Sequence, residues 1–262
     1  MNARFSRVYA GELAGIEARC VEVEVDLHVG LHSFSIVGLA DKALNEARER
    51  VSAALKNSGV KPPSQENRKI VVNLAPADVK KTGSQYDLAI AVGYLVATEQ
   101  IGKFETKGTM FLGELALDGG VRPVVGVLNV ACMAREKGFA ELYVPAANAA
   151  EAAFAGGVAV FPVRTLAELI AHLEGRAPIS PVCADETVFK SRAHSIDIAD
   201  VRGQAAAKRA LLIAACGGHH VLMSGSPGSG KTMLAQAFAG LLPALTREEV
   251  IEVTRIYSAS GA

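Results

Sequence analysis

The sequence predicts an α/β protein in two parts, and three observations lead to this fold class. Apolar and acidic residues alternate over residues 21–27, which is the period of a strand with one buried face. Short apolar runs then alternate with segments of helical period up to about residue 173. Further along, a glycine-rich loop runs into an amphipathic helix. The pattern indicates a compact α/β domain followed by the beginning of a second α/β unit.

Composition and charge limit the classes of protein to which the chain can belong. Its 262 residues include 27 Lys and Arg against 27 Asp and Glu, so the formal net charge is zero. Half of the residues are apolar and 21% are charged, which is typical of a globular protein and argues against disorder. Because the total charge is balanced, nucleic-acid binding would need a local patch or another subunit.

Neither the cysteines nor the apolar runs indicate secretion or a membrane. The spacings of Cys20, Cys132, Cys183 and Cys216 match neither a zinc site nor a redox pair, so we expect free thiols in a reducing compartment. The first 15 residues lack the apolar stretch of a signal peptide. The longest apolar runs reach about half of the ~20 residues that a membrane span needs. We therefore expect a soluble, cytoplasmic protein without membrane partners.

The first domain is expected to cover residues 1–175. Its predicted strands are 21–27, 34–37, 69–74, 110–117, 121–125, 142–144 and 158–161. Its predicted helices are 43–55, 86–98, 127–137, 147–155 and 166–173. Asp41 is the expected N-cap of the first helix, within which Glu46 and Arg50 have the i,i+4 spacing of an ion pair. Asp118-Gly119-Gly120 favours a hairpin turn.

Three carboxylates, those of Glu22, Glu24 and Asp26, share one face of the first predicted strand. This arrangement could serve a metal, but no histidine or further acid converges on it in the sequence. We interpret the three as a solvated strand face.

The second part follows a linker. Residues 176–195 lose periodicity and contain two prolines, so we predict a linker there and a second domain over 196–262. That domain should contain a helix over 204–216, a strand over 220–224 and a helix over 231–241. Thr246 and Glu249 have the spacing of a capping box that begins one more helix.

One motif carries a specific chemistry. It consists of Gly225, Ser226, Pro227, Gly228, Ser229, Gly230, Lys231 and Thr232, which fit G-x-x-x-x-G-K-[ST] between a predicted buried strand (221–223) and a helix. The glycines let the backbone wrap a phosphate, and successive N–H groups at the helix start bind the anion. Lys231 should reach the β- and γ-phosphates, and the Thr232 hydroxyl should ligate Mg²⁺. The motif predicts a site for ATP with Mg²⁺. The adjacent His219 and His220 point to opposite faces of a strand, so we do not interpret them as a metal site.

The chain also resembles a known family. Residues 197–204, 217–220 and 225–232 look like the start of an AAA+ ATPase module of the magnesium-chelatase-like branch. Residues 15–59 and 72–91 look like the N-terminal domain of the ComM/YifB family. The resemblance implies a ribosomal-protein-S5-domain-2-like fold, related to the Lon protease domain, followed by AAA+. It also implies an ATP-dependent hexameric DNA helicase that drives branch migration in natural transformation and recombination.

The Lon resemblance raises the question of a Ser–Lys peptidase. Residues 111–126 look like the Lon hairpin before the catalytic lysine, which places the lysine position at Leu128 and the serine position at Gln85. Ser84, one residue early, lacks a neighbouring amine, and Leu128 cannot act as a base. Lys80 and Lys81 follow in the same loop, where we expect them to be exposed and charged. The sequence therefore predicts an inactive protease fold, a packing, docking or DNA-guiding module.

The ATPase site is incomplete in this sequence. Catalysis needs carboxylates from a neighbouring strand and a trans-acting arginine, whereas only 30 residues follow Thr232. A βαβ crossover alone takes ~30 residues. We expect the chain to be the front portion of a longer protein, to bind nucleotide weakly if at all, and not to hydrolyse it.

Three functions remain open at this point. The first is a DNA-remodelling ATPase; the second is a chelatase subunit that inserts a metal into a tetrapyrrole; the third is a non-catalytic interaction module formed by residues 1–175. Candidate DNA contacts are the cationic side chains of Lys56, Lys61, Arg68, Lys69, Lys80 and Lys81, although such clusters are more often solvated faces.

Overall fold

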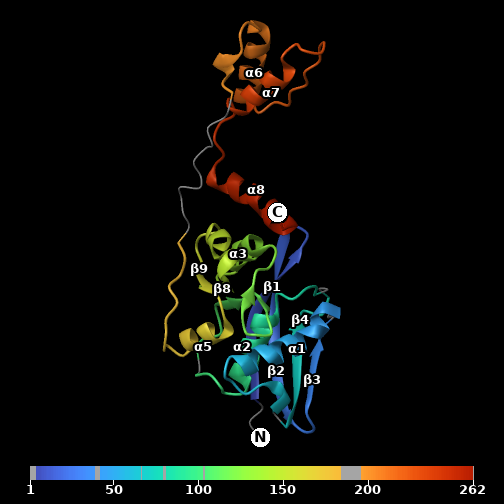
Figure 1. Ribbon diagram of the computed structural model, residues 1–262, viewed down its shortest axis with the longest axis vertical. Coiled ribbons are helices and arrows are strands. Elements are labelled where there is room, and N and C mark those ends of the chain that lie inside the picture. Colours follow the sequence, from blue (N-terminus) through green and yellow to red (C-terminus); the bar gives the residue numbers. More distant parts are fainter. Residues whose placement is uncertain are drawn as a thin grey trace. The chain divides into compact units, whose positions relative to one another are not determined.

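The computed structural model describes residues 4–38, 42–65, 67–78, 81–102, 104–183 and 196–261 (Figure 1). The chain forms two compact units. The first comprises Met1–Asp185 together with Ile251–Ala262, and the second comprises Glu186–Val250. The expected linker lies partly within residues 184–195, outside the described residues, as do Asp41 and Lys80.

The first unit is built on a mixed, mostly parallel sheet. Its seven strands have the order β3-β4-β2-β1-β5-β8-β9. They are β1 (Arg4–Ala14), β2 (Glu17–Val29), β3 (Ser33–Val37), β4 (Arg68–Ala75), β5 (Thr109–Phe111), β8 (Glu141–Pro145) and β9 (Ala159–Val163). The β1–β2 and β2–β4 pairs are antiparallel, and the other four pairs are parallel. The predicted α/β class is confirmed at this level.

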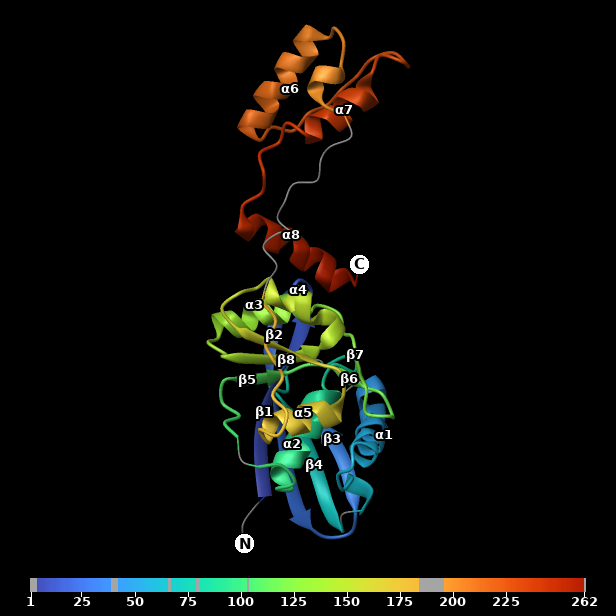
Figure 2. The same ribbon diagram turned by 60° about the vertical axis from the view of Figure 1, so that its left-hand side comes forward.

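Helices cover the two faces of the sheet unequally. On one face, α1 (Lys42–Asn57), α2 (Asp87–Ala97) and α5 (Leu166–Leu173) share one apolar core with the sheet. On the other face, α3 (Val127–Glu136) and α4 (Ala149–Ala153) share a second core (Figure 2). In β8 the alternation is explicit, because Tyr143 belongs to the first core and its neighbours Leu142 and Val144 to the second. The β3-β4-β2 side is thus covered mainly on the face of α1 and α2.

Most predicted elements of this unit are confirmed, but one strand was missed and two predictions were partly wrong. The predicted strand 110–117 is divided into β5 and β6 (Glu114–Leu115), and the predicted helix 147–155 consists of η2 (Ala146–Asn148) followed by α4. The period-two strand around Val21–Leu27 is β2, and its alternate residues are buried as expected.

The sequence did not indicate β1, which lies at the centre of the sheet and pairs with β2 from Arg4↔Leu27 to Ala14↔Glu17. Its inward positions include Ser6 and Glu12, so polar residues interrupt the apolar period on the buried face.

The three acidic residues of β2 take part in local ion pairs. Arg7 of β1 contacts Glu22 at 3.2 Å and Glu24 at 2.8 Å, and His28 contacts Asp26 at 3.0 Å. No cluster of metal-ligating side chains occurs among the described residues. The predicted hairpin is β6 (Glu114–Leu115) with β7 (Val121–Arg122).

The second unit contains η4 (Ile198–Asp200), α6 (Ala205–Gly217), α7 (Lys231–Ala239) and the start of α8 (Arg247–Ser260). Its core is small and centres on Val201, Leu211, Leu234 and Ala237. The predicted capping box is confirmed, because the Thr246 N–H donates to Glu249 at 2.7 Å and the Glu249 N–H donates to Thr246 at 3.3 Å. No described helix has the length and apolar character of a membrane span.

Candidate nucleotide-binding site

The loop of residues 225–230 has the backbone shape that its glycines allow. Gly228 and Gly230 have φ of 79° and 84°, in the left-handed region that other residues rarely adopt. A Cβ at either position would meet nothing within 4 Å, so conformation rather than space requires glycine here. Gly230 occupies the N-cap position of α7 and offers no side-chain acceptor. Among the described residues no side chain caps the first N–H groups of this helix, and such groups can bind an anion.

Lys231 is folded over the loop that precedes it. Its Nζ donates to the backbone oxygens of Gly225 at 2.9 Å and Ser226 at 2.8 Å, and lies 3.4 Å from Ser229 Oγ. These acceptors are neutral, whereas phosphate oxygens are charged and make stronger bonds to an ammonium. The arrangement places the positive charge of Lys231 beside the loop that precedes α7.

Thr232 is the last residue of the motif, and its hydroxyl is a candidate ligand of Mg²⁺. It is exposed in the first turn of α7, directly after Lys231. A hydroxyl at the start of this helix is the group that a P-loop offers to Mg²⁺. The residues present therefore fit Mg²⁺ bound together with a nucleotide.

The predicted buried strand before the loop is wrong in this structure. Residues 219–226 form no strand or helix, and Leu222 is 96% exposed and Val221 38% exposed. A strand is stabilised by hydrogen bonds to a neighbouring strand, and the second unit has none among its described residues. The apolar residues are present, but nothing in the described part of this unit pairs with their backbone.

The carboxylates near the loop in sequence serve as helix caps. Asp197 and Asp200 form a capping box around η4, and Glu249 caps α8. Among residues 196–250 no carboxylate lies on a strand beside the loop. The His219 ring packs against Gly217 at the end of α6. A Cβ added to Gly217 would lie 2.5 Å from His219 Nε2.

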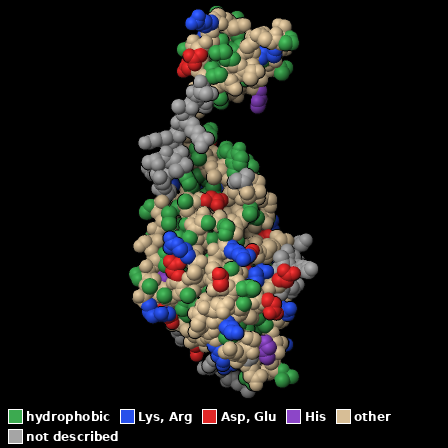
Figure 3. All heavy atoms as spheres, in the orientation of Figure 1, with side chains coloured by type: hydrophobic (Ala, Val, Ile, Leu, Met, Phe, Trp, Pro, Cys, Tyr) green, Lys and Arg blue, Asp and Glu red, His purple; other side chains and the backbone are tan. Residues whose placement is uncertain are grey.

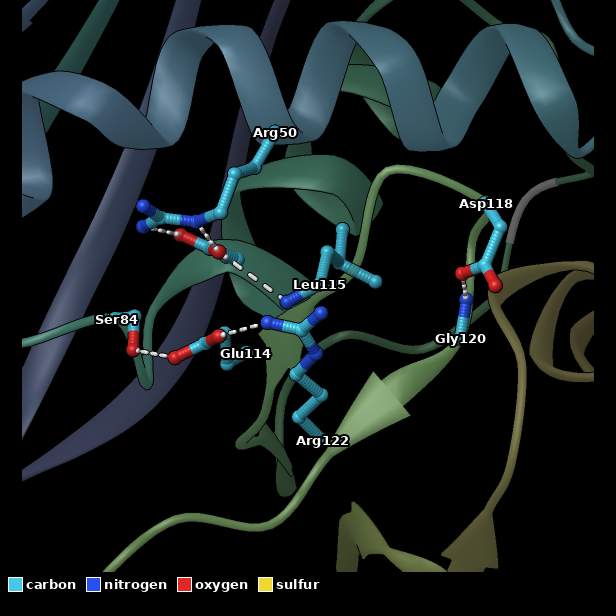
Figure 4. Close-up of polar contacts among 8 residues, drawn as sticks. Arg50, Ser84, Glu114, Leu115, Asp118, Gly120 and Arg122 are labelled. Carbon is cyan, nitrogen blue, oxygen red and sulfur yellow. Dashed lines mark hydrogen bonds and ion pairs between the residues drawn. The ribbon is translucent and has the colours of Figure 1, made fainter.

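In the first unit, the two positions aligned with a peptidase dyad have other roles. Gln85 donates from Nε2 to Glu12 Oε2 at 2.7 Å, and Leu128 is buried in the core under α3. The adjacent Ser84 donates to Glu114, which also forms an ion pair with Arg122 at 3.2 Å (Figure 4). A carboxylate already paired with a guanidinium is a poor base. This geometry provides no activated serine.

Lys81 differs from the expectation of an exposed loop lysine. It is fully buried, and its Nζ donates to the Pro76 carbonyl. Burial lowers the pKa of Lys81, while the charges of Asp78 and Glu12 act in the opposite direction. The sequence-based argument from solvent exposure was therefore wrong. Lys81 still forms no dyad, since it bonds to Pro76 and Ser84 bonds to Glu114.

Glu12 organises the polar side of a pocket of about 540 Å³ next to these residues. Glu12 is 3% exposed, and its carboxylate accepts hydrogen bonds from Thr82 at 2.9 Å, from Gln85, and from the Tyr86 hydroxyl. Burial raises the pKa of Glu12, and the three donors oppose this shift. Glu12 thus ties β1 to the loop before α2.

A second buried carboxylate, Asp87, begins α2. Arg50 binds it through Nε at 2.6 Å and through Nη2 at 3.0 Å, and the Leu115 N–H donates to it at 3.2 Å (Figure 4). The sequence assigned Arg50 to Glu46 within α1, whereas the structure directs its guanidinium to Asp87. Burial raises the pKa of Asp87 to about 6, against the lowering effect of Arg50 and of the Leu115 N–H.

Two family models match the chain, one before and one after the predicted linker. The family model of subunit ChlI of Mg-chelatase matches residues 23–148, and that of magnesium chelatase, subunit ChlI, matches residues 197–262. The competence protein ComM of Haemophilus influenzae is 39% identical over 254 residues, which are 96% of this chain and 49% of that protein. The chain belongs to the ComM/YifB family of ChlI-like proteins.

Two further relatives extend the comparison. Uncharacterized protein YifB of Escherichia coli is 39% identical over 257 residues, which are 98% of this chain and 50% of YifB. An uncharacterized protein of Mycobacterium tuberculosis is 41% identical over 256 residues, with 97% and 50% covered. The chain spans about half the length of these curated relatives.

Sequence reasoning missed Glu12 and the role of Asp87 in this member of the ComM/YifB family. The residues Ser6, Val8, Ala10 and Glu12 share the buried face of β1. Because two of the four are polar, their alternation with exposed residues did not indicate a buried strand. Asp87 stands at a helix start, where a carboxylate is ordinary. Only the packing of α1 against α2 shows that it is buried against Arg50.

Proposed function

We propose that residues 225–232 bind ATP with Mg²⁺, and that the protein to which this chain belongs is an AAA+ motor that remodels DNA. The observation that carries the nucleotide part is Lys231, whose ammonium lies over the loop carbonyls of Gly225 and Ser226 at the start of α7. A loop that only reverses the chain direction requires no lysine at this position, whereas a phosphate-binding loop uses the lysine to contact the β- and γ-phosphates.

Each group in this loop has a distinct task in the proposed site. The backbone N–H groups around Gly228 and Gly230 bind phosphate oxygens, and Lys231 moves from the loop carbonyls to the β- and γ-phosphates. Thr232 ligates Mg²⁺, which offsets charge on the same oxygens. Bound ATP supplies the free energy of hydrolysis, for which carboxylates and an arginine outside residues 196–250 are required.

The DNA part of the proposal rests on the family. One relative is named a competence protein, and the ComM/YifB resemblance implies an ATP-dependent hexameric helicase that drives branch migration in natural transformation and recombination. In this proposal the first domain has the Lon-like, S5-domain-2-like fold without the dyad, and it docks or guides DNA. Hydrolysis in a homo-hexamer drives strand movement.

The nucleotide part is tested with Lys231→Ala in the full-length protein. Loss of one charge-assisted interaction should weaken ATP binding about 10- to 100-fold, measured by titration with a fluorescent ATP analogue. Arg209→Ala, which removes an exposed positive charge from α6 in the same unit, is the matched control and should leave affinity unchanged. Uptake of ATP that does not depend on Lys231 would refute the assigned site.

The DNA part needs a separate measurement. A DNA-remodelling motor should show ATPase activity stimulated by branched or single-stranded DNA, and DNA-strand exchange that stops in Lys231→Ala. A lack of both in an otherwise ATP-binding protein would refute the DNA role and leave the nucleotide site intact.

A chelatase subunit is the second candidate, because both matching family models are described as ChlI of magnesium chelatase. The motor would then drive insertion of a metal into a tetrapyrrole. ATP-dependent metallation of protoporphyrin in the absence of any effect of DNA would favour this function over the first.

A further inference from the structure

The first unit contains a pocket lined by basic and hydroxyl side chains, far in sequence from the glycine-rich loop of residues 225–230. This pocket of about 520 Å³ lies where α1 packs beside the edge strand β3. The donors that line it are Arg48 and Lys56 of α1 together with His32, Ser33, Ser52 and Ser64. Glu49 is the one acidic residue that lines it.

We propose that this pocket binds a phosphate group of a nucleic-acid backbone. Guanidinium, ammonium and hydroxyl groups are the side chains that most often contact phosphates in protein–DNA complexes. A tetrahedral oxyanion with several acceptor oxygens matches a recess in which donors from three separate segments converge. The inference rests on the proposed DNA role and gives that role a location.

Arg48 is held at the pocket by the fold. Its Nη1 donates to the Phe34 carbonyl at 3.3 Å, which ties α1 to the edge strand. Lys56 lies two turns further along, in the last turn of the same helix. Helix spacing therefore places both cations on the side of α1 that lines the pocket.

The sheet register brings more positive charge to the same end. Val29 of β2 pairs with Arg68 of β4, and both His28 of β2 and Ser33 of β3 pair with Lys69. The connection from β2 to β3 therefore crosses the first residues of β4. Arg68 and Lys69 lie beside this connection, where they can contact phosphates adjacent to the one in the pocket.

The same connection presents two apolar side chains to solvent. Val29 is 99% exposed and Leu31 is 90% exposed, whereas Leu27 two residues earlier is buried. Hydrophobic and histidine side chains stand at the surface beside Lys and Arg at this end of the unit (Figure 3). Apolar residues next to phosphate contacts insert between bases or pack against them in many nucleic-acid-binding proteins. Val29 and Leu31 are thus assigned to bases or sugars.

A membrane surface is the alternative partner for basic residues that lie beside exposed apolar side chains, here Val29 and Leu31. Interfacial membrane binding depends on an extended apolar face, commonly with aromatic residues. Here the exposed apolar tip consists of two aliphatic side chains, and the donors line a recess rather than a flat rim. The recess favours a phosphodiester chain that can enter it.

The phosphate contacts are tested with Arg48→Ala/Lys56→Ala in the full-length protein. Binding of a fluorescent single-stranded oligonucleotide should weaken about tenfold or more at low salt, and the slope of log K against log[salt] should decrease by about two. The control is Lys107→Ala/Lys137→Ala, which removes the same charge from a different pocket on this unit. The control should retain both affinity and slope. ATP binding should be unchanged in both double variants. Urea denaturation followed by tyrosine fluorescence shows that the first unit, which contains all five tyrosines, remains folded in them.

Two more variants keep the test decisive. Lys56→Glu changes one exposed side chain at a helix end and should weaken binding even if the double variant folds poorly. Val29→Ser/Leu31→Ser should weaken DNA binding several-fold without altering the salt slope, since no charge is lost. Excess inorganic phosphate should compete with DNA only at high concentration.

Specific outcomes would overturn the inference. These are unchanged affinity and slope in Arg48→Ala/Lys56→Ala and Lys56→Glu, an equal loss in the control pair, or Val29- and Leu31-dependent binding to phosphatidylserine vesicles without an effect on DNA. Failure of the unsubstituted protein to bind DNA is a different result, because it overturns the proposed DNA role itself and this inference with it.

Discussion

The two units use apolar segments of the same kind, yet these segments reach opposite degrees of burial. In the first unit Val21, Val23 and Val25 are fully buried, because β2 has a strand on each side and these side chains lie in the core shared with α1 and α2. In the second unit Val221 and Leu222 remain exposed in an irregular segment. The difference shows that apolar character predicts burial only where the backbone also finds hydrogen-bonding partners.

The units also differ in whether their acidic side chains are buried. The first buries carboxylates and satisfies them from distant segments, as Glu12 and Asp87 show. In the second, the acidic residues near the loop cap helices at the surface. A buried charge is expensive unless it is paired, so the first unit depends on its polar partners for stability. In the second unit, the ammonium of Lys231 contacts only neutral acceptors among the described residues, the Gly225 and Ser226 carbonyls and Ser229 Oγ.

The substitution Asp87→Ala should have the largest effect on stability. The substitution leaves the Arg50 guanidinium and the Leu115 N–H without their acceptor, and it should lower the free energy of unfolding by about 3–5 kcal/mol. Urea denaturation followed by tyrosine fluorescence reports on this, because all five tyrosines lie in the first unit and the chain has no tryptophan. Asp118→Ala, at the exposed hairpin turn of the same region, should cost less than about 1 kcal/mol. Similar losses in both variants would contradict the assignment.

A matched pair of leucine substitutions compares the two units directly. Leu88→Ala removes a fully buried side chain of α2 and should cost about 2–5 kcal/mol. Leu222→Ala, at a position that is 96% exposed, should change stability by less than about 0.5 kcal/mol. Hydrogen exchange resolved by peptide measures each unit separately. A large cost at Leu222 would break the comparison, since it would mean that residues 221–223 are packed in solution.

The smallest effects lie in the pH dependence, whose sign should differ between the units. The pKa of Asp87 is raised to about 6 from an ordinary value of 3.8, so the folded state binds the proton more tightly. The resulting stability is present below about pH 4 and is lost as the pH rises to about 6, by roughly 1 kcal/mol per unit. Asp87→Asn should remove this slope from urea unfolding curves.

Glu249 should behave in the opposite way. Its hydrogen bonds with Thr246 lower its pKa below 4.5, so the cap stabilises the start of α8 at neutral pH and is lost as the pH falls through the lowered value. An NMR titration of the Glu249 carboxyl together with protection of its amide follows this loss. A raised pKa for Glu249, as for Asp87, would contradict the expected difference between the two units.

Much of the fold followed from local patterns. The period of β2, the helices α1, α2 and α3, and the hairpin at Asp118 were all predicted from residues near one another in the chain. β1 was not, because Ser6 and Glu12 interrupt its buried face. The candidate site was located from the motif alone, because a loop of this kind is built from consecutive residues. Phosphate binding by Lys231 stays a prediction.

What the sequence alone determined is therefore the α/β order, the capping box of α8 and the loop that precedes α7. Each depends on residues within a few positions, whose backbone preferences act without distant partners. The tertiary structure decided that Arg50 binds Asp87 rather than Glu46, that Lys81 is buried rather than exposed, and that residues 221–223 form no strand. These outcomes depend on which segments pack together, because burial and hydrogen-bond pairing are set by neighbours far away in the chain.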